Sequence, residues 1–157
     1  MIREHLAILG VLAGSLVWAP AVSYGSSAPP EGPRLLERIH ADAALARVRA
    51  NRLQSVAADQ LIDYQVDATY LSEIRHCILD MDNALEQLGY LRDITPVERQ
   101  DADRAGALIH DLSLDTDRAI RFLDQNRHTL WMPAYRTYTS NIYLEARRLA
   151  RATRAIG

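Results

Sequence analysis

The sequence predicts an all-α protein, an up-down antiparallel four-helix bundle. Residues 34–88 contain neither Gly nor Pro, and their apolar or small residues recur every three or four positions, which is the period of one helix face. Thr95-Pro96 and Pro133 then mark the starts of two further helices. Helices of similar length joined by short loops favour an up-down bundle with packing like that of a coiled coil.

The first 21 residues have the pattern of a cleavable secretory signal peptide. Arg3 lies in a short leading segment, a mostly apolar run follows at Leu6–Ala19, and small residues surround Ala21. This run of about 14 residues is shorter than the roughly 20 that a membrane-spanning helix needs, so we expect cleavage after Ala21. The alternative is retention as an uncleaved anchor, because Glu4 offsets the charge of Arg3. Cleavage predicts export to the periplasm or out of the cell.

Residues 22–33 are rich in Ser, Pro and Gly and carry almost no charge. This composition predicts a flexible linker. The rest of the chain, residues 34–157, has the length of one ordinary domain, which we expect to be the bundle.

The first part of the apolar stripe predicts helices near 34–61 and 64–89. We expect the break near Asp63, a residue type that can cap the start of the second helix. The alternative is one long helix over 34–89, about 80 Å in length, within a dimeric helical assembly. Half of its stripe would lack an intrachain partner, so this alternative requires a homodimer.

Two more helices are predicted near 96–127 and 133–156. Thr95 and Glu98 have the spacing of a capping box, and Pro96 stands at the first helical position, where proline is tolerated. Both signals mark the same helix start.

Composition excludes several classes of function. The formal net charge is −2, whereas nucleic-acid-binding domains usually carry a basic excess, so we expect no nucleic-acid partner. Every basic residue is Arg, which excludes chemistry at a lysine amine. Cys77 is the only cysteine, and we expect a buried thiol rather than an intermolecular disulfide. After removal of the signal, no stretch is apolar enough for a stable membrane span.

The predicted helices carry net charges of about +2, −4, −2 and +4 in chain order. Opposite sign then pairs the first helix with the second and the third with the fourth. Arg147, Arg148, Arg151 and Arg154 form a basic run near the end of the chain. It is either a surface for a polyanion or a solvated helix face neutralised by the acidic helices.

Two Glu-x-x-His pairs, Glu37/His40 and Glu73/His76, have the spacing of di-iron carboxylate bundles. These four residues are weak metal-ligand candidates. With the apolar stripe in the core, Glu37, Glu73 and His76 point outward and His40 lies on the flank. We therefore expect no metal site and no cofactor.

The predicted topology brings aromatic side chains together at one end of the bundle. We call the following residues the aromatic pole: Tyr64, Tyr70, Phe122, Trp131, Tyr135 and Tyr138. Tyr64, Tyr70, Trp131, Tyr135 and Tyr138 are the candidates for contact with a partner or ligand, because aromatic side chains are favoured at contact surfaces. The alternative is that these rings close the end of the core.

No pattern of catalytic residues is present, and we expect a protein that is not an enzyme. The leading hypothesis is an exported bundle that acts through contacts with an unidentified protein in the cell envelope. The alternative is a carrier of a small ligand or a metal that uses the bundle interior or the aromatic pole.

The segment from Tyr64 to Ile156 also carries four motifs: Leu71-x-x-Ile74-x-x-x-Ile78, Leu91-Arg92-Asp93-Ile94-Thr95-Pro96, Leu123-x-x-Asn126-Arg127 and Pro133-x-Tyr135-Arg136-x-Tyr138. In these motifs the chain resembles a group of uncharacterised exported bacterial helical-bundle proteins. The resemblance implies the helical fold and export, and it implies no activity.

Overall fold

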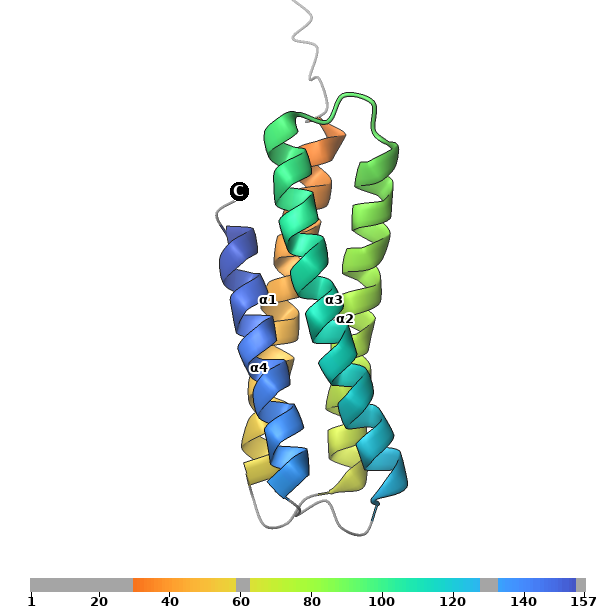
Figure 1. The fold of residues 1–157 in the computed structure, drawn as a ribbon, viewed down its shortest axis with the longest axis vertical. Coiled ribbons are helices and arrows are strands. Elements are labelled where there is room, and N and C mark those ends of the chain that lie inside the picture. The colour runs from red at the N-terminus through yellow and green to blue at the C-terminus, as the bar shows by residue number, and fades with distance from the viewer. Residues whose placement is uncertain (1–29, 59–62, 128–132, 155–157) are drawn as a thin grey trace, which may run out of the picture.

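A computed structural model describes residues 30–58, 63–127 and 133–154. Over these ranges the chain forms four α-helices, which Figure 1 shows side by side along one long axis. In chain order they are α1 (Glu31–Ala58), α2 (Tyr64–Tyr90), α3 (Pro96–Gln125) and α4 (Pro133–Arg154). The predicted all-α four-helix bundle is confirmed.

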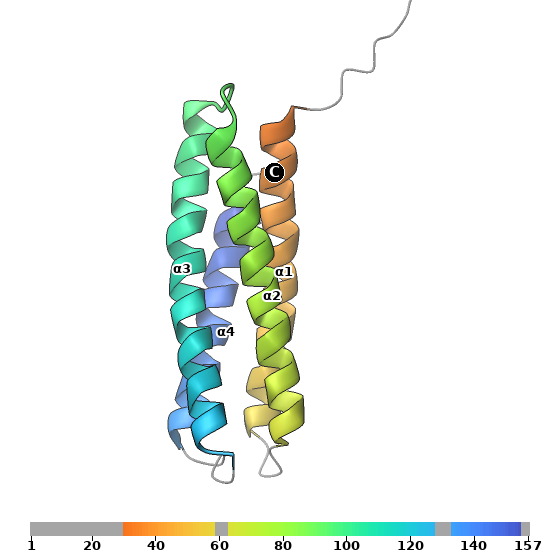
Figure 2. The same ribbon diagram turned by 90° about the vertical axis from the view of Figure 1, so that its right-hand side faces the viewer.

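The helices pack as a ring in chain order. α1 lies against α2 and α4, and α3 lies against the same two helices. The two views in Figures 1 and 2 show that consecutive helices run in opposite directions. α1 and α2 are therefore antiparallel neighbours, and the alternative of one long helix over 34–89 is wrong.

Asp63 separates the first two helices as predicted. Its backbone is extended, and its Oδ1 accepts a hydrogen bond of 2.8 Å from the Gln65 backbone N–H. This bond satisfies one of the amide donors that a helix start leaves without an intrahelical partner.

The start of α1 corrects the predicted linker. The helix begins at Glu31, so residues 31–33 belong to its first turn and not to a linker. Pro33 is tolerated there because the amides of a first turn have no intrahelical acceptor to lose. The linker residues 22–29 and the predicted signal at 1–21 lie outside the described residues.

The start of α3 has both bonds of the predicted capping box. The Thr95 hydroxyl accepts from the Glu98 backbone N–H at 3.2 Å, and the Glu98 carboxylate accepts from the Thr95 backbone N–H at 2.7 Å. α2 ends nearby at Tyr90, one residue beyond the predicted boundary, with Leu91 as its C-cap.

Aliphatic side chains and alanines fill the core. The fully enclosed large aliphatic side chains come from all four helices: Ile39, Leu53, Leu71, Ile74, Met81, Leu88, Ile109, Leu112, Leu123, Ile142 and Leu149. On α1 the buried positions include Ala43, Ala46, Ala50 and Ala57. The backbones of α1 and α3 approach within 8 Å, measured between Cα atoms, across the ring diagonal, whereas those of α2 and α4 do not within the described ranges. Small side chains permit this approach because they leave room for the opposite backbone.

Candidate functional site: a basic face on α1 and α4

The bundle separates its charge between two halves. Counting Arg against Asp and Glu, α1 and α4 carry +2 and +4, whereas α2 and α3 carry −4 and −3. Because α1 neighbours α4 and α2 neighbours α3, one side of the bundle is basic and the other is acidic. A field of one sign over a surface attracts partners of the opposite sign.

The basic side has a row of arginines along the groove between α1 and α4. Tyr143 of α4 shares a pocket with Arg47 of α1. Arg147 and Arg151 follow Tyr143 at intervals of four residues, and Arg154 comes three residues later, so all three lie along the same stripe of α4. The Arg151 Nε donates to the Arg147 backbone carbonyl at 3.3 Å, which holds this side chain along the stripe.

Contacts between α1 and α4 fix this orientation. The His40 Nδ1 lies 3.2 Å from the Thr153 Oγ1, and the Gln54 Nε2 donates to the Ser140 Oγ at 3.3 Å. Arg47 lies seven residues after His40 and seven before Gln54, so it shares their side of α1. The glutamate Glu37, three residues before His40, is also on this side and is exposed.

The α1/α4 groove is hollowed at its middle. The pocket there has a volume of about 290 Å³ and is lined by five residues: Arg47, Val48, Asn51, Arg52 and Tyr143. Arg47 and Arg52 supply positive charge, Val48 supplies exposed apolar surface, and the Tyr143 ring is half-buried. We call these five residues together with Arg147, Arg151 and Arg154 the basic face.

The arginines of the basic face have no carboxylate within ion-pairing distance in the described part of the chain. The ion pairs between helices join α1 to α2, as in Arg49–Glu73 at 3.1 Å, and α2 to α3, as in Arg75–Asp117 at 3.9 Å. α4 has one pair within itself, Arg148–Glu145 at 2.6 Å. The predicted charge pairing of the third and fourth helices therefore has no ion pair among the described residues, and the basic run is not neutralised in the expected way.

Part of the aromatic pole is buried in the end of the core. Tyr135 is fully buried and offers no surface to a partner. Its ring stacks on Phe122 with centroids 5.9 Å apart, and Phe122 also meets the half-buried Tyr138 at 5.6 Å. These three rings close the end of the core, which was the alternative interpretation.

The remaining members of the pole have separate surroundings. The Tyr64 hydroxyl donates to the Asp124 Oδ1 at 2.9 Å, and the Arg127 guanidinium lies 4.7 Å from the centre of the Tyr64 ring. Tyr70 is half-buried against the core. Trp131 lies outside the described residues.

Asp67 is a buried acid that sequence reasoning did not single out. It is fully enclosed, and neither carboxylate oxygen has a hydrogen-bond partner in the described structure. Burial raises its pKa to about 6; the facing Tyr135 hydroxyl acts in the opposite direction, and the Asp63 charge adds to the rise. The helical period does place Asp67 on the buried face of α2, since it lies four residues before Leu71 and seven before Ile74 in the apolar stripe.

The four metal-ligand candidates do not form one cluster. Glu37 is exposed, while His40 is tied to Thr153 as described above. Glu73 pairs with Arg49, and the His76 Nε2 lies 3.4 Å from the Asp80 Oδ2 with most of its ring in solvent. Across residues 30–58, 63–127 and 133–154 no three His, Cys, Asp or Glu side chains are grouped to hold a metal ion.

Comparisons of the chain with family models, curated proteins and solved structures give no match. Within the described residues, no helix combines the length and the apolar character needed to cross a membrane.

Proposed function

We propose that this is an exported, non-enzymatic bundle protein that acts by binding an acidic protein partner at its basic face. The observation that carries the proposal is the row of arginines on α1 and α4 that have no ionic partner in the described chain. An exposed arginine without an ionic partner destabilises a fold little, because surface ion pairs contribute little to stability. A row on one face therefore adds little to stability and much to association with a partner of opposite charge.

The shape of the face favours a protein segment over a flat membrane surface. Its pocket is concave and combines Arg47 and Arg52 with the Tyr143 ring and Val48. Arginine and tyrosine are enriched among the residues that dominate protein interfaces, because each gives area and directed hydrogen bonds together. An acidic segment carrying apolar side chains matches both properties of this groove.

Export rests on the sequence of residues 1–21. Its apolar core, Leu6–Ala19, and the small residues at its end support removal of this segment during secretion. An extracytoplasmic protein of this kind would meet its partner in the periplasm or outside the cell.

A peptide-binding titration tests the proposal. The probe is a fluorescein-labelled peptide of alternating Glu and Leu residues, and its anisotropy is followed at 50 mM and at 300 mM salt. Arg47→Ala combined with Arg147→Ala should weaken binding by tenfold or more at low salt. The matched control is Arg104→Ala combined with Arg121→Ala, two exposed arginines on α3, which should leave the affinity unchanged.

Two results would contradict this function. Equal loss in both double variants would mean that the peptide senses overall charge and not the α1/α4 groove. Binding to vesicles containing anionic lipid, with no binding to the peptide, would assign the basic face to a membrane surface.

A further inference from the structure

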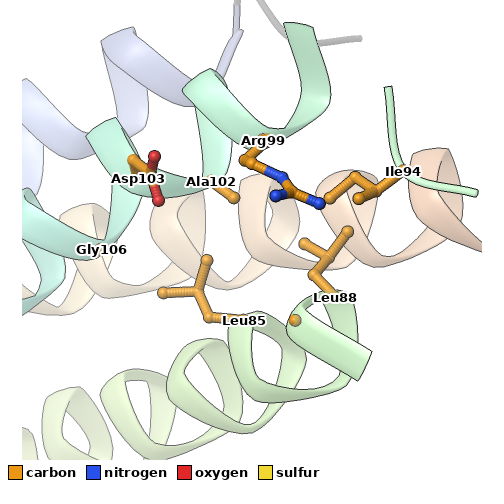
Figure 3. Close-up of a pocket in the computed structure, with 8 residues that line it drawn as sticks. Leu85, Leu88, Ile94, Arg99, Ala102, Asp103 and Gly106 are labelled. Carbon is orange, nitrogen blue, oxygen red and sulfur yellow. The ribbon is translucent and has the colours of Figure 1, made fainter. Parts of the chain in front are cut away.

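A second pocket lies at the end of the bundle where α2 turns into α3. It has a volume of about 490 Å³, within the range of roughly 300 to 1,000 Å³ that is typical of small-molecule sites. Figure 3 shows it between the last turns of α2 and the first turns of α3, with Ile94 of the connecting turn beside it. It is separate from the aromatic pole, which lies at the other end of these two helices.

Small residues of both helices line the pocket. Ala102 and Gly106 lie one turn apart on α3, and Gly89 lies near the end of α2. A methyl group added at Gly106 would come 3.5 Å from the Leu85 Cδ1, an ordinary van der Waals contact, and one at Gly89 would meet nothing within 4 Å. Both positions therefore have room for a methyl group without any movement of the backbone.

The floor and the mouth of the pocket differ in character. Leu85 of α2 and Ile94 of the turn provide apolar surface, whereas Leu88 also lines the pocket but is fully buried. Arg99 extends its guanidinium across the opening towards Ile94, and Asp103, four residues later, also lines the pocket (Figure 3). No carboxylate of the described chain lies within 4.0 Å of Arg99, although spacing of four residues would permit a pair with Asp103.

We propose that this pocket binds a small amphipathic anion, with its apolar body against Leu85 and Ile94 and its carboxylate on the Arg99 guanidinium. A planar guanidinium donates two parallel hydrogen bonds to a carboxylate, and this geometry selects carboxylates over neutral head groups. Apolar surface supplies most of the affinity and the charged contact fixes the orientation. This site is independent of the basic face and of its acidic partner.

The probes are decanoate and the neutral 1-decanol, titrated against the protein by calorimetry and by methyl NMR. Decanoate should shift the methyl signals of Leu85, Leu88 and Ile94 and should bind at least fivefold more tightly than decanol. Arg99→Ala should remove this preference, because it should weaken the binding of decanoate and leave the binding of decanol unchanged. Arg104→Ala, an exposed arginine on the same helix outside the pocket lining, should change neither affinity.

Filling the pocket gives an independent test. Gly106→Leu should abolish binding of both probes, and Ala102→Leu serves as a second filling variant should the first lower the melting temperature. Binding that survives in a folded filling variant, shifts confined to methyl groups elsewhere in the bundle, or no binding of decanoate at millimolar concentration would overturn the proposal. Because the acidic-peptide titration does not involve this pocket, either proposal can fail without the other.

Discussion

The Asp67 carboxyl faces the Tyr135 hydroxyl inside the core, across the diagonal between α2 and α4. Both side chains are fully buried, and neither polar group closes a hydrogen bond of ordinary geometry. Burial raises the pKa of Asp67 to about 6, and it also raises the pKa of Tyr135, with the nearby Asp67 charge adding to that rise. A buried polar group without a partner destabilises the fold, and a buried charge does so more strongly.

Asp67→Asn should therefore stabilise the protein at neutral pH. The folded-state pKa of about 6 exceeds the ordinary value of 3.8, so the folded state holds the proton more tightly than the unfolded state. The contribution of Asp67 to stability is then most favourable below pH 3.8, falls between pH 3.8 and 6, and stays level above that range. A difference of about two pKa units corresponds to about 3 kcal/mol, and Asn should recover roughly 1 to 3 kcal/mol at pH 7.5.

Urea unfolding at pH 4 and at pH 7.5 measures this effect. The gain from Asp67→Asn should be small at pH 4, where the wild-type carboxyl is protonated. The control Asp111→Asn changes an exposed acid on α3 and should behave like wild type at both values. Equal stability of the Asp67 variant and wild type at pH 7.5 would show that the folded protein accommodates the charge without cost.

Cys77 should be almost unreactive in the folded protein. It is a free, buried thiol, and burial raises its pKa to about 11, with the Asp42 and Asp80 charges adding to the rise. Since the thiolate is the nucleophile, both low ionisation and enclosure slow its reaction. Ellman's reagent at pH 7.5 should label it at least a hundredfold more slowly than in 6 M guanidinium chloride, and rapid labelling without denaturant would contradict the described packing.

The sequence carried enough information for the helices and most of the core. The period of Leu36, Ile39 and Ala43 on α1 follows from helix geometry alone, and Asp63 and Thr95 act as caps through their own local backbone. The start of α1 was missed because Pro33 looks like a helix breaker in a Ser- and Pro-rich context, although its place in a first turn removes the penalty.

The candidate site was harder to predict because it depends on which helices are neighbours. Arg47 and Tyr143 are 96 residues apart in the sequence, and their shared groove arises only once α4 packs beside α1. The sequence shows the basic run from Arg147 to Arg154. Whether acidic side chains neutralise this run depends on which helices lie beside α4. Asp67 fits the helical period, yet a carboxylate in a core position is usually taken as a sign of a loop because its burial is unfavourable.

Thr95→Ala should destabilise the protein by about 1 kcal/mol, since it removes the hydroxyl that accepts from the Glu98 amide at the start of α3. Thr69→Ala is the matched control, because Thr69 is exposed inside α2 and its hydroxyl donates only to the Gln65 carbonyl. Thermal unfolding of both variants measures the difference. A loss of similar size at Thr69 would mean that threonine removal, and not the cap, is responsible.

Enlarging a buried alanine on α1 should destabilise the bundle. Ala46 is fully buried, and the backbones of α1 and α3 come close to each other across the diagonal of the ring. A leucine there has no space to occupy without moving a backbone or a neighbouring side chain, so Ala46→Leu should reduce the free energy of unfolding by about 1 to 3 kcal/mol. Ala41→Leu is the control: Ala41 is exposed on the same helix, and Ala and Leu are both strong helix formers. Guanidinium unfolding compares the two, and an unchanged midpoint for Ala46→Leu would mean that the diagonal between α1 and α3 is wide enough to accept a large side chain.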